Sequence, residues 1–287
     1  MKEKKKRVSV VIPNYNYARY IRARIKSVMM QTYPVYEIIV LDDGSTDGSA
    51  EMAKSIIFDA KVGRPDLNVK YIGNEKNSGN VLLQWKKGFM EAKGDYVWIA
   101  EADDLCSRRF LEEAMKGFRD DEVVLSYTES RLISSAGVMM APNFRWSRDK
   151  EKTGRYKKSY IRPGREEIEE ALAVRCTIPN VSGVVIKKAD EIPIYKYLDE
   201  AANFKQVGDW YFYVKMLTNG KISYNKKALN YFRVHRGSVT RKARSLENYE
   251  EIVGMHEWLI KDFQISETVQ GYMKAEEERI KEKWGLA

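Results

Sequence analysis

The sequence predicts an α/β fold, built on a Rossmann-like, mostly parallel sheet that carries helices on both of its faces. Short β-branched or aromatic runs alternate along the chain with segments whose apolar residues recur every three or four positions. Strands that are separated by single helices form parallel sheets. Two of the strand-like runs, 38–41 and 96–100, end directly in carboxylates. Because ligands of open α/β sheets bind beyond the carboxyl ends of the strands, we look for the functional site there.

The first half of the chain repeats one unit, a strand followed by a helix. The run 8–12 is β-branched and stops at Pro13, and apolar residues at helical spacing follow over 21–29. In the second unit, residues that favour helix N-caps lie at 44–49, between the strand and the helix. We expect strands at 8–12, 37–41, 69–72 and 96–100, and helices centred on 21–29, 53–60, 81–89 and 110–118.

The second half of the chain is less regular. From Arg131 to Pro163 the pattern loosens into Gly, Pro, Arg and Lys, and we predict a loop or hairpin excursion over the site. We expect strands at 123–127, 181–186 and 228–234, and helices at 165–175 and 210–220. Apolar residues at helical spacing between 249 and 284 predict that the chain ends in helices.

The composition suits a folded protein with an anionic partner. With 287 residues and 44% apolar content, the chain can bury a substantial core. The net charge of +9 suits nucleic acid, a lipid head group or a sugar nucleotide. Surplus Lys and Arg also simply solvate a surface, so charge alone does not choose among these interpretations.

The cysteines and the N-terminus bear on the compartment. Cys106 and Cys176 lie far apart without a CxxC pair, which favours a reducing compartment and therefore the cytoplasm. The basic start, 1–7, is followed by an apolar run that is too short for a signal peptide. No apolar stretch is long enough to span a bilayer, so we expect any membrane contact to be peripheral, on the inner face.

The loop that follows the first strand, 13–17, contains no glycine. Dinucleotide-binding and P-loop proteins need glycines there because their backbone approaches phosphate closely, so the sequence argues against a dehydrogenase or a kinase of those types. A cation held by carboxylates is another way to bind phosphate. The acids at 42–43 and 101–104 suit that role, with turn formation and helix capping as their structural alternatives.

Seven short motifs follow one another along the chain. They are Val-Ile-Pro-Asn-Tyr-Asn at 11–16, Leu-Asp-Asp-Gly-Ser-Thr-Asp at 41–47, Asn-Ser-Gly at 77–79, Trp-Ile-Ala-Glu-Ala-Asp-Asp at 98–104, Thr-Ile-Pro-Asn at 177–180, Gly-Asp-Trp at 208–210 and Tyr-Phe-Arg-Val-His at 231–235. In order and spacing they resemble the family 2 glycosyltransferases of the GT-A fold. The resemblance implies a GT-A domain over 1–240, with a nucleotide-binding half to about 128 and an acceptor half over 129–240. The C-terminal helical extension, 241–287, lies outside it.

The resemblance also implies roles for individual residues. Glu101-Ala102-Asp103 takes the place of the DxD motif, with Glu in the first position. Glu101 would reach a ribose hydroxyl, and Asp103 would hold Mn²⁺ or Mg²⁺ against the diphosphate. Asp209 would be the catalytic base, and one base with in-line attack implies inversion at the anomeric carbon. The nucleotide-binding residues implied are Pro13, Tyr15, Asp42, Asp43, Asn77, Gly79, Glu101, Ala102 and Asp103.

A few other side chains are candidates for the site. His235 lies at a strand end and is a second candidate metal ligand, with a structural role as the alternative. Trp210 is a candidate for stacking on a sugar ring, and Asp104 for contact with the acceptor or the sugar. We expect three other aromatic residues to pack inside the protein: Trp85, Trp98 and His256.

These observations predict a metal-dependent, inverting glycosyltransferase. Its donor would be a UDP-sugar, and its acceptor a hydroxyl of a glycan or lipid-linked molecule in polysaccharide or glycoconjugate biosynthesis. A sugar-1-phosphate nucleotidyltransferase is an alternative, but it needs a glycine-rich N-terminal loop, which 13–17 is not. A non-catalytic binder of nucleic acid or anionic membrane would explain the charge but not the paired acids, and we expect no nucleic-acid partner. The tail helices would pack on the domain or form a homo-oligomer.

Overall fold

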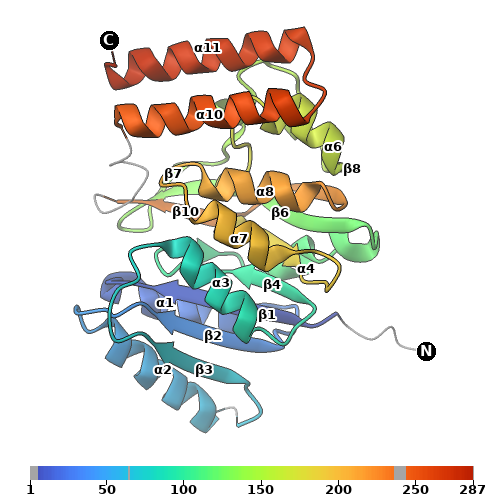
Figure 1. The fold of residues 1–287 in the computed structure, drawn as a ribbon. Helices are drawn as coiled ribbons and strands as arrows, with labels where there is room; N and C mark the ends of the chain where they lie inside the picture. Colours follow the sequence, from blue (N-terminus) through green and yellow to red (C-terminus); the bar gives the residue numbers. More distant parts are fainter. Residues whose placement is uncertain (1–5, 64, 236–243, 287) are drawn as a thin grey trace.

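The computed structural model describes residues 6–63, 65–235 and 244–286 (Figure 1). Its strands form one sheet in the order β3-β2-β1-β4-β9-β6-β10-β5, with β7 beside β6 and β8 beside β10. The strands are β1 (Val8–Asn14), β2 (Glu37–Asp42), β3 (Val69–Gly73), β4 (Tyr96–Ile99), β5 (Leu105–Cys106), β6 (Val123–Ser134), β7 (Met139–Ala141), β8 (Tyr160–Pro163), β9 (Val184–Lys187) and β10 (Lys221–Val234). The helices are α1 (Ala18–Met29), α2 (Ser49–Gly63), α3 (Val81–Glu91), α4 (Phe110–Ala114), α5 (Arg145–Arg148), α6 (Gly164–Glu167), α7 (Ile194–Ala201), α8 (Gly208–Leu217), α10 (Leu246–Asp262) and α11 (Glu267–Trp284). Short helical turns are η1 (Gly117–Arg119), η2 (Arg155–Lys157), η3 (Ile168–Leu172) and η4 (Val181–Gly183).

The longest strand pairings in the sheet are parallel. β1 pairs in parallel with β2 and β4, β2 with β3, and β6 with β10. β9 runs antiparallel between β4 and β6 and joins the two parallel parts. The short strands β5, β7 and β8 are antiparallel as well. The predicted α/β fold with a mostly parallel sheet is therefore confirmed.

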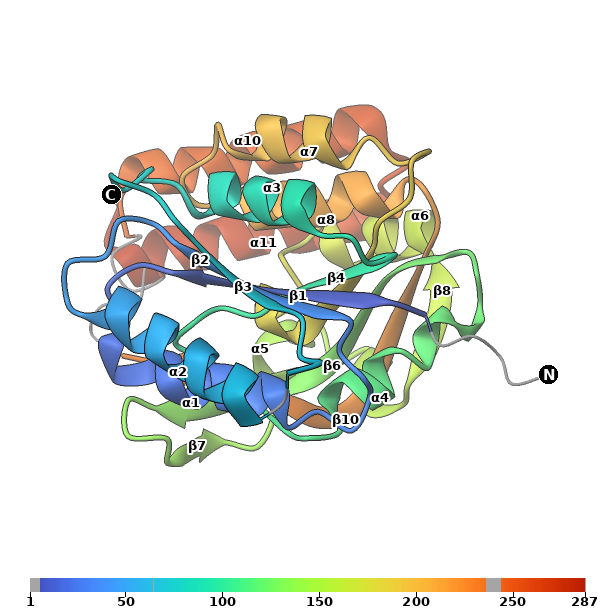
Figure 2. The ribbon, with the colours of Figure 1, turned by 90° about the horizontal axis from the view of Figure 1, so that it is seen from below.

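Helices cover both faces of the sheet (Figure 2). α1 and α2 lie on one face, and α3 and α7 lie on the other. Every residue of β1 and β2 is buried, as expected for parallel strands that are covered on both sides. Successive side chains of a strand point to opposite faces, so the sheet separates two apolar cores. Trp98 belongs to the core under α1, and Trp85 to the core under α8, as predicted.

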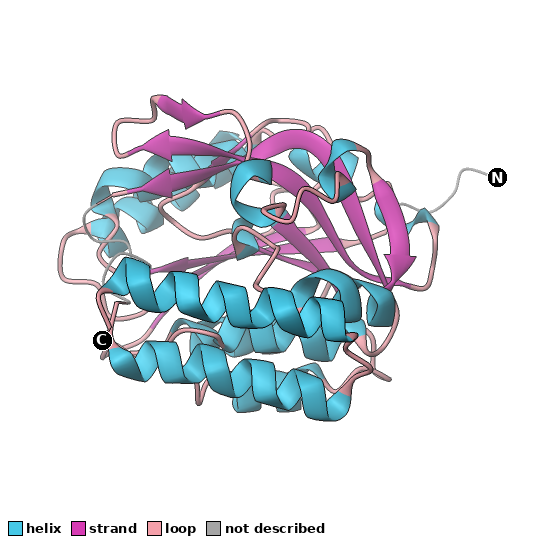
Figure 3. Cartoon of the chain, turned by 90° about the horizontal axis from the view of Figure 1, so that it is seen from above, coloured by secondary structure: helices cyan, strands magenta, loops and turns pink. Residues whose placement is uncertain are grey.

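The C-terminal helices pack on the outer side of α8 (Figure 1; seen from above in Figure 3). Ile252, Leu259 and Ile280 join the same apolar core as α8, so α10 and α11 cover that core. Ser245 and Ser266 cap the two helices by accepting backbone N–H groups, as N-cap residues do. The predicted C-terminal helices are therefore present. Among the helices that the structure describes, none is long and apolar enough to cross a membrane.

Several predicted boundaries were wrong. The predicted loop or hairpin excursion, 131–163, does contain a hairpin, formed by the end of β6 and β7, but it also contains α5 and β8, which were not predicted. The last strand, β10, starts at Lys221, seven residues before its predicted start at 228, and its register with β6 shifts near Ala228. Residues 181–183 form a helical turn before β9. The expected boundary between domain and extension, 240/241, lies outside the described residues.

Candidate active site

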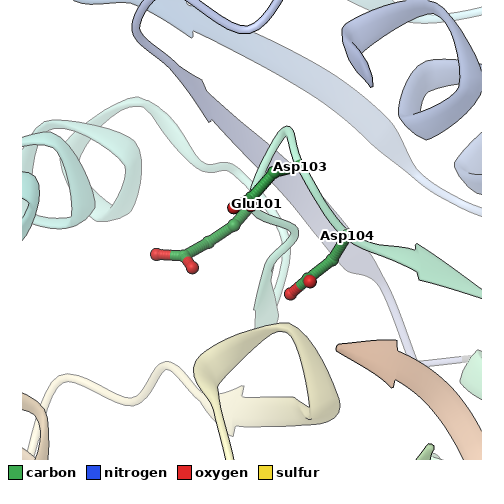
Figure 4. A group of neighbouring side chains, drawn as sticks. All are labelled: Glu101, Asp103 and Asp104. Atoms are coloured by element: carbon green, nitrogen blue, oxygen red, sulfur yellow. The ribbon is translucent and has the colours of Figure 1, made fainter. Parts of the chain in front are cut away.

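Three acidic side chains follow β4 in a single turn: Glu101, Asp103 and Asp104 (Figure 4). One carboxylate oxygen from each of these acids lies within 4.8 Å of the other two. β4 lies inside the sheet, between β1 and β9, so this turn is at the carboxyl edge of the sheet as predicted. Oxygen ligands of this kind suit a hard divalent cation such as Mg²⁺ or Mn²⁺.

The acids of this cluster repel one another in a site shielded from water. Burial, followed by the charges of Asp103 and Asp104, raises the pKa of Glu101 well above its ordinary value. Burial, followed by the charge of Asp103, raises the pKa of Asp104 to about 7. A bound cation would offset this excess of negative charge. The donor set and its electrostatics therefore fit a divalent metal ion.

Asp104 is the innermost of the three acids, with 1% of its surface exposed. The backbone N–H of Arg233 donates to its Oδ1 at 2.8 Å, and the side-chain amide of Asn180 donates to its Oδ2. Asn180 accepts in turn from the amide of Asn230 at 2.7 Å. Asp104 thus fixes the acid loop to β10. The expectation that it meets the acceptor or the sugar is wrong, because its carboxylate is bound inside the protein.

Asp103 lies beside His235, whose Nε2 is 3.0 Å from its Oδ2. The imidazole packs against two tyrosine rings, with centroid distances of 5.8 Å to Tyr17 and 5.4 Å to Tyr20. The Arg233 guanidinium donates to the backbone oxygen of Asp103 at 2.6 Å and lies over the Tyr20 ring. The two residues expected to hold the metal are therefore neighbours. His235 is placed either to bind the ion or to orient Asp103 toward it.

Asp42 and Asp43, at the end of β2, are buried and fully engaged in hydrogen bonds. Asp42 accepts from the Asn14 amide at 2.6 Å and from the backbone N–H of Ser45 at 2.9 Å. Asp43 accepts from the Ser78 backbone and hydroxyl, and from two further side-chain amides, those of Asn74 and Gln84. The two carboxylates therefore hold together the loops at this end of the sheet.

The remaining residues expected to bind the nucleotide lie on these loops. Asn77 accepts the N–H of Gly79 and packs close to Gly44, which has φ +74°. A Cβ at Gly44 would lie 2.9 Å from the backbone nitrogen of Asn77, so the contact requires glycine. Pro13 is buried in β1 and Ala102 is buried in the acid loop, whereas Tyr15 is 42% exposed.

Asp209 lies half-buried in the first turn of α8. Burial raises its pKa to about 6, and the Trp210 backbone N–H, which donates to its Oδ1 at 2.7 Å, opposes part of this rise. Its charge contributes to the raised pKa of Glu101, so the two carboxylates lie within electrostatic reach. The structure thus places Asp209 near the acid cluster, although the two come from segments a hundred residues apart in the sequence.

Residues 9–167 match the model of a known family, "Glycosyl transferase family 2". The matched stretch is more than half of the chain and contains both groups of strand-end acids. The chain belongs to glycosyl transferase family 2. The resemblance seen in the sequence motifs is therefore confirmed. Asp209 and His235 lie beyond the matched stretch, so their roles stay predictions.

Relatives of this family 2 chain are similar to it over part of its length. It is 34% identical over 119 residues to an uncharacterized glycosyltransferase of Nostoc sp. and 31% over 129 residues to glycosyltransferase GlyG of Streptococcus pneumoniae. It is 29% identical over 131 residues to the putative teichuronic acid biosynthesis glycosyltransferase TuaG of Bacillus subtilis. These matches cover 41%, 43% and 46% of this chain. They cover 34%, 40% and 49% of the relatives, so the chain spans less than half of each.

Two solved structures resemble the chain over nearly its whole length. Staphylococcus aureus TarS 1–349, in complex with UDP-GlcNAc, has a TM-score of 0.65 at 19% identity, over 96% of this chain and 73% of that one. The mannosyltransferase PcManGT from Pyrobaculum calidifontis, in complex with GDP-Man and Mn²⁺, has a TM-score of 0.60 at 17% identity, over 99% and 71%. At such identities the likeness shows the fold, which is the predicted GT-A fold.

In this family 2 chain, Trp210 belongs to the interior. It is 4% exposed, its indole N–H donates to the backbone oxygen of Leu172 at 2.8 Å, and its ring meets His256 edge-on. The expectation that Trp210 stacks on a sugar is wrong, because α8 turns this residue toward the C-terminal helices. His256 is buried and packs, as predicted.

Arg24, on α1, is a charged residue near the acid cluster that sequence reasoning missed. It is fully buried, with its guanidinium carbon 5.1 Å from the centre of the Trp98 ring. Its positive charge opposes the rise in the pKa of both Glu101 and Asp104. The sequence held a signal for it, because Arg24 interrupts the apolar face of the helix over 21–28.

Proposed function

We propose that this protein is an inverting, divalent-metal-dependent glycosyltransferase that moves a sugar from a nucleotide-diphosphate donor to an acceptor hydroxyl. The observation that carries the proposal is that Asp209, whose pKa is raised to about 6, lies close enough to the acid cluster for its charge to act on Glu101. Family membership and the relatives named above support glycosyl transfer as the activity. Structures of this fold in complex with UDP-GlcNAc, and with GDP-Man and Mn²⁺, support the donor class and a metal.

In this proposal the acid cluster would hold the donor's diphosphate through a divalent cation. Asp103, with His235 3.0 Å away, would hold the metal ion, and Glu101 would reach the ribose. When bound, a divalent ion neutralises charge on the departing diphosphate. The exposed Tyr15 lies between Asn14 and Asn16, which bond to the loop after β2, and in this proposal the loops at this end of the sheet enclose the base. A UDP-sugar is the first donor to test.

Asp209 acts as the general base for the acceptor. The acceptor oxygen attacks the anomeric carbon while the bond from that carbon to the diphosphate oxygen breaks, and the hydroxyl proton moves to the Asp209 carboxylate. This single displacement inverts the anomeric configuration. Because the pKa of Asp209 is about 6, the carboxylate is ionised at neutral pH and protonated in acid. Transfer should therefore increase as the pH rises through about 6 and then level off.

The acceptor belongs to polysaccharide or glycoconjugate assembly in this proposal. The name of TuaG, a putative teichuronic acid biosynthesis enzyme, supports this context. We propose a glycan or lipid-linked hydroxyl as acceptor, met at the cytoplasmic face of a membrane. A panel of free glycans and lipid-linked acceptors, assayed with one donor, would identify which of the two is used.

Asp209→Asn tests the proposed base. We expect kcat to fall by about 10²–10⁴-fold, the usual contribution of a general base, while calorimetric affinity for UDP with Mn²⁺ stays unchanged. Asp199→Asn is the matched control, because Asp199 is an exposed residue of α7 whose carboxylate forms an ion pair with Lys86 of α3. Wild-type kcat in Asp209→Asn, or a product that retains the donor's anomeric configuration, would overturn the mechanism. If no nucleoside diphosphate binds with any divalent metal, the activity itself is refuted.

A further inference from the structure

Glu251, on α10, reaches across to the segment that leads into α8. Its Oε1 accepts the backbone N–H of Lys205 at 2.8 Å, and its Oε2 accepts those of Gln206 at 2.7 Å and Val207 at 3.4 Å. One carboxylate from the C-terminal extension thus accepts hydrogen bonds from three consecutive backbone N–H groups. Charge-assisted bonds from a carboxylate to backbone N–H groups are among the stronger hydrogen bonds in proteins.

The residues that Glu251 binds lie immediately before Gly208 and Asp209. A helix start leaves backbone N–H groups without helical partners, and a polar side chain at the N-cap position usually accepts from some of them. Here the N-cap residue is Val207, whose apolar side chain cannot accept a hydrogen bond. Glu251, more than forty residues further along the chain, accepts instead from the backbone N–H of Val207 and of the two residues before it, and places a negative charge near the positive end of the α8 dipole.

The same helix start is fixed from its other side by close packing. A Cβ at Gly208 would lie 2.5 Å from Cδ1 of Leu82 on α3 and 2.6 Å from the backbone oxygen of Ala201 on α7. Only glycine allows this approach, so α8 begins packed closely against α3 and α7. The first turn of α8 is therefore held between packing on one side and the Glu251 carboxylate on the other.

We propose that Glu251 is a positioning residue for Asp209, and that the C-terminal extension completes the active site through it. This inference rests on the proposed function, in which Asp209 takes the acceptor proton. Fixing 205–207 fixes the position and orientation of the first turn of α8. It thereby sets the direction of the Asp209 side chain and the distance from its carboxylate to an acceptor hydroxyl. Small displacements of a general base are costly, since proton transfer requires hydrogen-bond distance.

Two substitutions at Glu251 and one at Glu247 test the proposal. Glu251→Ala removes the acceptor atoms, whereas Glu251→Gln keeps one carbonyl oxygen of similar reach and removes the charge. Glu247→Gln is the matched control, since Glu247 lies one turn earlier on α10 and pairs only with the exposed side-chain amine of Lys205 among the ion pairs described. Hydrogen–deuterium exchange of the segment 205–211, and of α3 as reference, is measured for all three variants alongside steady-state kinetics.

We expect Glu251→Ala to speed exchange over 205–211 by about tenfold or more while α3 exchanges as in the wild type. We expect its kcat to fall about 10- to 100-fold with the donor KM unchanged, and Glu251→Gln to recover part of that loss. Glu247→Gln should match the wild type in both measurements.

Each result has a separate meaning. Wild-type exchange over 205–211 in Glu251→Ala overturns the positioning role, whatever the activity. Faster exchange with unchanged kcat shows that the segment is fixed without consequence for transfer, which also overturns the proposal. If the wild-type protein transfers no sugar from any nucleotide donor, the proposed function fails, and the exchange data still decide whether Glu251 fixes the start of α8.

Discussion

Two groups of carboxylates lie at the carboxyl edge of the same sheet, and their surroundings differ. Asp42 and Asp43, after β2, accept hydrogen bonds from neutral amides, hydroxyls and backbone N–H groups. Glu101, Asp103 and Asp104, after β4, face one another, and burial with mutual repulsion raises the pKa of Glu101 and Asp104. Each carboxylate of the first group is surrounded by hydrogen-bond donors, whereas in the second group Asp104 has such donors and the carboxylates also repel one another.

If the proposed function holds, this difference separates acids that support the framework from acids of the reaction site. Both groups follow a strand and both consist of adjacent or nearly adjacent acids, so sequence alone gives them similar weight. A carboxylate surrounded by donors lowers the energy of the folded state, because each donor would otherwise be buried without a partner. A carboxylate surrounded by other carboxylates raises that energy and is tolerated where it binds a cation.

Asp103→Asn should have the largest effect on the β4 group. We expect metal-dependent transfer to fall by about 10³-fold or more, because the residue expected to bind the ion loses its charge. We expect calorimetric binding of Mn²⁺ to weaken in parallel. The melting temperature should stay equal or increase, because one repelling charge is removed. A large loss of stability in this variant would show that the β4 acids are framework, like the β2 acids.

Asp43→Ala should have the opposite profile. Removing this carboxylate leaves the buried Gln84 amide and the less buried donors of Asn74 and Ser78 without their acceptor, so we expect the free energy of unfolding to fall by about 1–3 kcal/mol. Urea unfolding followed by circular dichroism measures the change. Asp59→Ala, on the outer side of α2, is an exposed control that should lie within about 0.5 kcal/mol of the wild type. A stable Asp43→Ala that no longer binds UDP would instead make Asp43 a ligand residue.

The smallest effect expected is a pH dependence of stability from Asp104. Its pKa is raised to about 7 in the folded protein from an ordinary value of 3.8, so the folded state binds this proton more tightly than the unfolded state. The resulting stabilisation is present below about pH 4 and is lost as the pH rises from about 4 to 7. Asp104→Asn should therefore flatten the fall in melting temperature between pH 5 and 7. An unchanged slope would contradict this electrostatic account.

Much of the fold could be predicted from the sequence because its signals are local. The alternation of β-branched runs with helical stripes is strong from 8 to 118, and each of β1 to β4 lies where its run predicts. Prediction failed where local pattern is weak: β7 and β8 are short strands added to existing edges, and their pairing depends on β6 and β10. The early start of β10 at Lys221 has the same cause, since residues 221–224 pair with β6 and β8, which are distant in the sequence.

The site was only partly predictable from sequence. The acids at 101–104 and the candidate ligands Asp103 and His235 were found from motifs, and the structure brings those two side chains to 3.0 Å. We expected Trp210, which follows Asp209, to stack on a sugar ring. In the structure its side chain points from α8 into the protein interior. Arg24 and Glu251 were missed because their partners lie far away in the sequence.

The sequence by itself determined the α/β class, the strand-end acids and the family, since these depend on local periodicity and on short motifs. Only the tertiary structure decided which acids are surrounded by hydrogen-bond donors and which by other acids, that Trp210 faces the interior, and that α10 supplies a carboxylate to the segment before α8. These properties depend on which donors and charges surround a group in space. Such neighbours come from chain segments that lie as much as 132 residues apart, so no local pattern records them.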